Sequence, residues 1–202
     1  MPTRLKALFA LLLTAAASGS ALAHTGVDVH AHVGFASGFL HPFTGLDHMA
    51  VMLAIGLWSA LVAQKFGREM LWGPLAFANV LLLGAALGME GVAIPAVEPM
   101  IAASLVATGL LVLTRLPLRG VGAALLAGAF ALSHGLAHGY ELAANVNAFP
   151  ALAGMVTATL LLHTMGLALG WSLRGANVWV PRVLGGAVAA FGSALLILQL
   201  GN

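Results

Sequence analysis

Histidine and carboxylate side chains gather in two short segments of an otherwise apolar chain. The first segment is HPFTGLDH, residues 41–48, and the second is SHGLAHGYE, residues 133–141. Imidazole and carboxylate groups bind divalent metal ions or carry protons. Ionisable side chains at membrane depth are costly and mark functional sites. The candidate ligands are His41, Asp47, His48, His134, His138 and Glu141.

The spacing in each segment predicts how these groups are presented. On one helix, His134, His138 and Glu141 fall within a stripe about 60° wide. In the first segment, Pro42 disfavours helical backbone at the residue before it. We therefore expect a helix to begin near Pro42 and His41 to lie on a bend. From a bend, His41 can converge with Asp47 and His48.

One further histidine and one histidine-rich segment extend this pattern. His163 lies near the middle of a later apolar run, and we expect it to be a ligand or relay near the midplane of the membrane. Before the first apolar run, residues 24–32 read HTGVDVHAH, which is either a merely polar tail or a site that captures metal. The candidate capture residues are His24, Asp28, His30 and His32.

The composition narrows the choice of ion and excludes several classes of function. The chain has no cysteine, so thiolate metal sites and disulfides are excluded. Nitrogen ligands with carboxylates favour Ni, Co, Zn or Cu(II) over Mg or Ca. The sequence carries no basic cluster and no phosphate-binding loop, so we expect neither a nucleic-acid partner nor ATP hydrolysis by this chain. We also expect no permanently bound cofactor.

Apolar elements must position these residues. The chain is 61% hydrophobic and 7% charged, so lipid must be its main solvent. Residues 1–23 have the charged, apolar and small-residue regions of a cleaved signal peptide. We assign 24–42 to a periplasmic His-rich tail and helix entry, and 43–202 to an all-α domain of six transmembrane helices. The predicted spans are 43–63, 70–89, 97–115, 120–140, 150–172 and 181–200.

The charges predict the orientation of the spans. All basic residues after the signal peptide fall in the first, third and fifth loops, which positive-inside bias places in the cytoplasm. Both mature termini are then periplasmic, in a bacterial cytoplasmic membrane. Spans one and four both carry a histidine–carboxylate cluster toward the outer face. This repetition suggests the hypothesis of a 3+3 inverted repeat.

The paired segments resemble the signatures of the HupE/UreJ family of nickel permeases. The resemblance covers nearly the whole chain, and Ser133 stands where phenylalanine is expected. It implies uptake of Ni²⁺, with Co²⁺ as a secondary substrate, in support of hydrogenase or urease maturation. It also implies that the motif histidines and carboxylates, His41, Asp47, His48, His134, His138 and Glu141, bind the ion.

Two other classes of function fit the same residues. An intramembrane hydrolase could hold zinc in a His/Asp cluster with an open position for water. A helical bundle could instead hold haem between two histidines. The sequence leaves open whether the chain acts alone, as a homo-oligomer or with an accessory partner.

Overall fold

The computed structural model describes residues 34–143 and 147–201, and within these ranges the regular structure is entirely helical. The predicted signal peptide and His-rich tail, with His24, Asp28, His30 and His32, lie outside the described residues. The helices are α2 (Phe35–Thr44), α3 (Leu46–Val62), η1 (Arg68–Leu71), α4 (Trp72–Met89), α5 (Val97–Thr114), α6 (Val121–Leu142), α7 (Ala148–Leu173) and α8 (Trp179–Leu200).

The helices have the length and composition of membrane spans. Five segments, formed by η1 with α4 and by α5 to α8, are long and apolar enough to cross a bilayer. The bent pair of α2 and α3 makes a sixth if it is counted as one span. Large apolar side chains such as Leu125, Phe149 and Ile197 remain mostly exposed on the helix surfaces. This pattern suits a multi-pass protein solvated by lipid.

The first predicted span differs from the expectation in one important respect. Helix α2 continues through His41 and Pro42, and the chain bends by 83° only after it, at Gly45. Inside a helix, proline removes one backbone N–H and its ring crowds the carbonyl four residues earlier. Pro42 lies only two residues before the end of α2, so little helix follows it. Phe39 stacks on Phe35 and makes a tilted ring contact with Phe43, and these contacts support the α2 turns around it. The expectation that His41 lies on a bend before the helix was therefore wrong.

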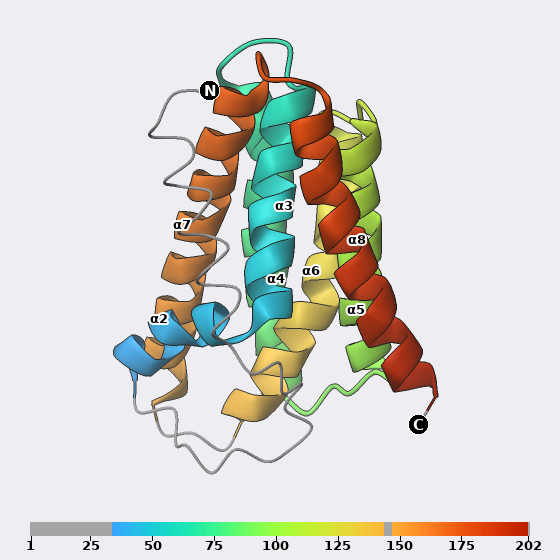
Figure 1. The fold of residues 1–202 in the computed structure, drawn as a ribbon. Helices are drawn as coiled ribbons and strands as arrows, with labels where there is room; N and C mark the ends of the chain where they lie inside the picture. The colour runs from blue at the N-terminus through green and yellow to red at the C-terminus, as the bar shows by residue number, and fades with distance from the viewer. Residues whose placement is uncertain (1–33, 144–146, 202) are drawn as a thin grey trace.

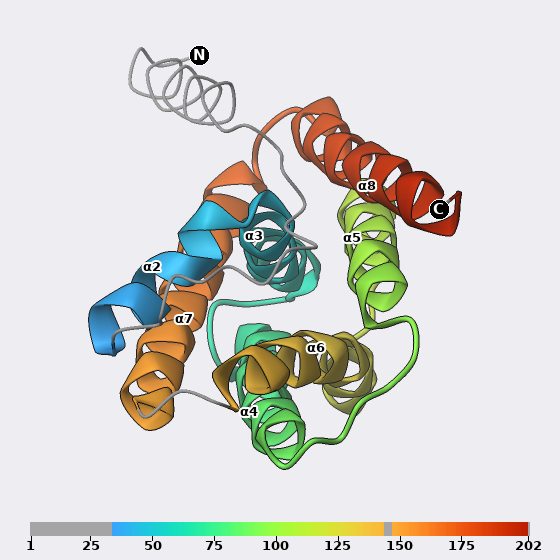
Figure 2. The same cartoon turned by 90° about the horizontal axis from the view of Figure 1, so that it is seen from below.

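The spans associate as three pairs, α3 with α7, α4 with α6, and α5 with α8 (Figures 1 and 2). The first two pairs are parallel and the third is antiparallel. Glycines set the closest approach in each pair. In α6, a Cβ added at Gly135 or Gly139 would overlap the backbone carbonyls of Leu81 or Ala85 in α4. These glycines directly follow His134 and His138, so the tight contact with α4 also fixes where those imidazoles lie.

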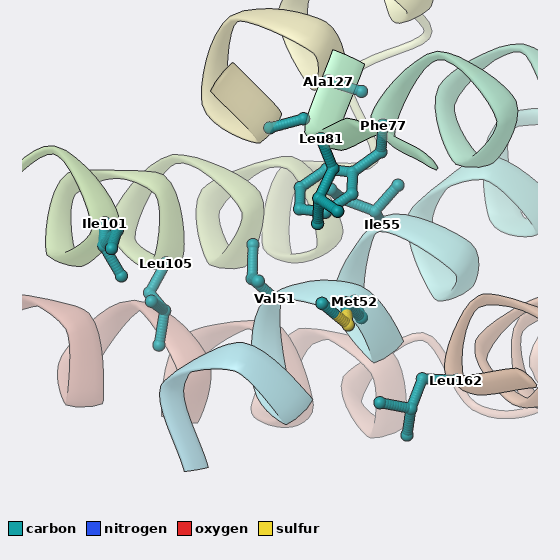
Figure 3. Close-up of a cluster of buried hydrophobic side chains, with 10 residues drawn as sticks. Val51, Met52, Ile55, Phe77, Leu81, Ile101, Leu105, Ala127 and Leu162 are labelled. Atoms are coloured by element: carbon teal, nitrogen blue, oxygen red, sulfur yellow. The ribbon is translucent and has the colours of Figure 1, made fainter. Parts of the chain in front are cut away.

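A buried apolar cluster joins the pairs to one another (Figure 3). It starts one turn after His48 on α3 and draws side chains from five helices. Its members are Val51, Met52, Ile55, Phe77, Leu81, Ile101, Leu105, Ala127, Ala131 and Leu162. Because such interiors are closely packed, the cluster supports the backbone that carries the neighbouring polar residues.

Candidate metal centre

Four histidines from three helices meet where α3 begins and α6 ends. The ring centroids of His48 and His138 are 4.7 Å apart, and those of His48 and His134 are 5.1 Å apart. His41, from α2, lies 4.8 Å from His138 and 6.0 Å from His48. The bend at Gly45 turns α2 across the start of α3, which allows His41 to approach from the side. The two sequence segments thus form a single cluster.

Asp47 orients His48. Its carboxylate oxygen Oδ1 lies 2.8 Å from the His48 Nδ1 and also accepts a 2.8 Å bond from the His48 backbone N–H. Because an ionised carboxylate only accepts, Nδ1 carries the proton and Nε2 keeps its lone pair. The His48 Nε2 is buried and has no hydrogen-bond partner among the described residues. A carboxylate behind an imidazole is the usual support of a metal-binding histidine.

The two α6 histidines, His134 and His138, are buried, and each has an oxygen acceptor near its Nδ1. His134 donates from Nδ1 to the carbonyl oxygen of Phe130 at 3.0 Å, which leaves its Nε2 unpartnered within the described part of the chain. His138 has its Nδ1 3.6 Å from a carboxylate oxygen of Glu141, too far for a hydrogen bond. Glu141 also lies 3.9 Å from the His41 Nε2. Glu141 therefore lies between two imidazoles without tightly engaging either.

The cluster has suitable dimensions and charge for a divalent ion. His41, His48 and His138 each offer a nitrogen within 4.8 Å of the other two. Two nitrogens bound to one ion at about 2.0–2.1 Å lie no more than about 4.2 Å apart. A small contraction would thus bring all three into coordination. Asp47 and Glu141, as carboxylates, supply two negative charges that offset those of the ion.

A cavity of about 250 Å³ lies beside the cluster, between the start of α5 and the end of α6. Glu98 and Glu141 provide its acidic lining, and the rest is mostly apolar. Glu98 interacts electrostatically with Asp47, His48 and Glu141. Sequence reasoning did not select Glu98 as a site residue. The available signal was an acidic side chain at the start of an apolar span, which also occurs at ordinary helix N-termini.

His163 does not join the cluster. It is buried in α7, and the ring of Phe77 contacts both it and His134, with centroids 5.2 Å and 5.5 Å away. Phe77 was not identified from the sequence, where one phenylalanine in an apolar span gives no signal. The structure therefore brings together the six residues of the two segments and leaves His163 apart.

Comparison with known proteins decides the family. The profile of the HupE / UreJ protein family matches residues 11–195. The protein HupE of Rhizobium leguminosarum bv. viciae is 43% identical over 179 residues, which cover 87% of this chain and 91% of that protein. The chain belongs to the HupE/UreJ family. No solved structure matches it.

Membership of the HupE/UreJ family supports a metal permease at the family level, since this family is of the nickel/cobalt transporter type. It is an accessory and transporter family rather than an enzyme family. The resemblance seen in the sequence is thereby confirmed. The family therefore favours the permease over the zinc hydrolase and the haem carrier.

Proposed function

We propose that this protein imports Ni²⁺, with Co²⁺ as an alternative substrate, and that the histidine cluster is its outer binding site. The observation that carries the proposal is the convergence of His41, His48 and His138 from three helices, with carboxylates beside them. In this proposal Asp47 orients His48, His134 extends the site inward and Glu141 balances the charge. Nitrogen-rich sites of this kind select late first-row ions.

The proposal includes the direction of transport. The basic residues lie in the connections α3–α4, α5–α6 and α7–α8, apart from Arg182 in the first turn of α8. We assign this end of the bundle to the cytoplasm of a bacterial inner membrane. The cluster lies at the opposite ends of these helices and would therefore face the periplasm. A cleaved signal peptide at 1–23 would leave both mature termini on that side. The tail residues His24, Asp28, His30 and His32 would then collect the ion next to the cluster.

The pairing of the helices supports an inverted 3+3 repeat within this proposal. An inverted repeat relates α3 to α6, α4 to α7 and α5 to α8. Such a relation converts the α3–α7 contact into the α6–α4 contact and maps the α5–α8 contact onto itself. These are the three main packing pairs.

Uptake of radiolabelled Ni²⁺ into cells that lack other nickel transporters tests the proposal. We expect His48→Ala and His138→Ala to abolish uptake, since each removes one of three converging nitrogens. Thr157→Ala is the matched control, because its hydroxyl bonds to its own helix and its side chain is exposed. Normal uptake by both histidine variants at equal expression would remove the proposal. Competition by Co²⁺, Zn²⁺ and Cu²⁺ in the same assay measures the selectivity.

A further inference from the structure

His163 is held in a defined state deep in the helical bundle. Its Nδ1 lies 2.8 Å from the carbonyl oxygen of Thr159. Because a carbonyl oxygen only accepts, Nδ1 carries the proton and Nε2 presents a lone pair. That Nε2 is buried and unpartnered among the residues that the structure describes, and so is the hydroxyl of Thr159 one turn away. Buried polar groups are normally satisfied, so two such groups on one turn need an explanation.

His134, which belongs to the outer cluster, has the same hydrogen-bonding arrangement as His163. Its Nδ1 is bonded to the carbonyl four residues earlier, and its Nε2 is also left open in this part of the chain. The two imidazoles thus have the same tautomer fixed by the same kind of backbone bond, one on α6 and one on α7. Fixing the tautomer in this way is how a histidine is kept ready as a metal ligand.

The side chain of Phe77 contacts both of these imidazoles. Its ring makes edge contacts with both, at interplanar angles of 63° and 61°. It is completely buried and belongs to the apolar cluster in which Leu81 and Ile55 are its neighbours (Figure 3). A ring in contact with both imidazoles can act as a barrier to transfer of an ion from one to the other. A rotation of the ring within the cluster would open the way.

We propose that His163 and Thr159 form a second, deeper ion position, and that Phe77 is the movable partition between this position and His134. The inference rests on the proposed transport function and adds a step to it. The outer cluster has two carboxylates close by, whereas the deeper position has one imidazole and one hydroxyl. The deeper position therefore binds the ion more weakly, and weak binding at successive sites is what allows an ion to leave.

The first test separates binding at the outer cluster from passage beyond it. In His163→Gln, the amide keeps a donor for the Thr159 carbonyl and much of the side-chain volume, but it is a poor ligand for Ni²⁺. Purified variant protein should bind Ni²⁺ at the outer cluster with unchanged affinity in equilibrium dialysis. Uptake should fall by about 10–100-fold, the usual effect of removing a supporting group from a metal site. Thr164→Ala is the control on the adjacent, exposed position.

Each result of this test has a distinct meaning. Unchanged uptake by His163→Gln, while the wild type transports, would overturn the second position and leave the proposed function intact. Loss of outer-cluster binding in this variant would assign His163 to the outer cluster and would also overturn the inference. A wild-type protein that neither binds nor imports Ni²⁺ would instead remove the proposed function itself.

The second test concerns Phe77 and uses the absence of cysteine from the chain. His163→Cys introduces a unique thiol, which a cationic, membrane-impermeant methanethiosulfonate reagent can probe from outside right-side-out spheroplasts. Adding Phe77→Ala should raise the labelling rate by about tenfold or more, because the open arrangement would otherwise be a minor state. Leu75→Ala, an exposed position on α4, is the control. Equal labelling rates with and without Phe77 would rule out the partition.

Discussion

The His48 imidazole of α3 lies 4.7 Å from the His138 imidazole of α6, ring centroid to centroid, and each has a carboxylate close to its Nδ1. The two supports differ. The Asp47 carboxylate is hydrogen-bonded to His48 at 2.8 Å, whereas the Glu141 carboxylate stays 3.6 Å from His138. His48 is thus already oriented, and His138 can still adjust when an ion arrives.

Replacing Asp47 with asparagine should weaken nickel binding without unfolding the protein. The asparagine keeps the shape of the side chain but loses the charge that stabilises the proton on His48 Nδ1. Loss of such a support typically lowers metal affinity or activity by about 10–100-fold. Equilibrium dialysis of purified protein and initial uptake rates should both show the change. Glu90→Gln, on an exposed carboxylate at the end of α4, provides the control, and equal effects of both variants would contradict the orienting role.

Uptake should depend on pH with a fixed sign. An imidazole that binds a metal must be neutral, so full activity requires pH above the histidine range. As external pH falls through about 6.5, the reference pKa of histidine, protons compete with Ni²⁺ and uptake should decline. The measurement is the initial uptake rate in proteoliposomes between pH 5 and pH 8, roughly the range over which histidine titrates. Uptake that rises on acidification would contradict imidazole ligation.

Gly139→Ala should disrupt the site through helix packing rather than through a ligand. The added methyl group would overlap the Ala85 carbonyl and push α6 away from α4. Overpacking of this kind costs about 1–3 kcal/mol of folding stability. A thermal-stability assay in detergent should show a lower Tm together with weaker Ni²⁺ binding. Gly122→Ala on the same helix meets nothing within 4 Å and should behave as wild type.

Glu98→Gln should reduce uptake mainly at low nickel concentration. Glu98 lines the cavity beside the cluster and carries charge near Asp47, His48 and Glu141 without belonging to the group of converging nitrogens. Removal of one attracting charge lowers the local concentration of a dication and the rate of its capture. KM for uptake should rise while the maximal rate changes little, and high salt should diminish the difference between variant and wild type. A fall in the maximal rate with constant KM would place Glu98 in a later step.

The sequence predicted those parts of the fold that depend on long, regular patterns. Apolar runs of membrane length correspond to α4 through α8, and the ends of these helices fall close to the predicted limits. Helix α2 was missed because ten residues are too few for a span and Pro42 was taken as a start. The true break is at Gly45, where the backbone leaves the helix at φ −90° and ψ 109°. Glycine allows many conformations, so its presence alone does not predict a bend.

For the site, ionisable residues in lipid-solvated helices were a strong signal. Burying them in a membrane costs free energy, so they are rare there and usually functional. Antiparallel topology then placed the two segments at the same end of the bundle. Phe77 and Glu98 had no such signal. One is an ordinary apolar residue, and the other resembles a helix-terminal charge. They lie near the histidines only because α4, α5 and α6 pack together. The spacing of residues within one segment does not predict that packing.

Helix α2 packs closely against α7. Gly38 contacts the backbone of Ala151, and Gly154 contacts the backbone of Phe35. The helices that carry His41 and His163 are therefore packed tightly together. Of these two residues, only His41 belongs to the outer cluster. A tilt of α7 against α6 would carry His41 away from His138 in the same movement that shifts His163 relative to Phe77. Release of the ion from the outer cluster and opening of the way to His163 would then be one helix movement. Neither event would occur without the other.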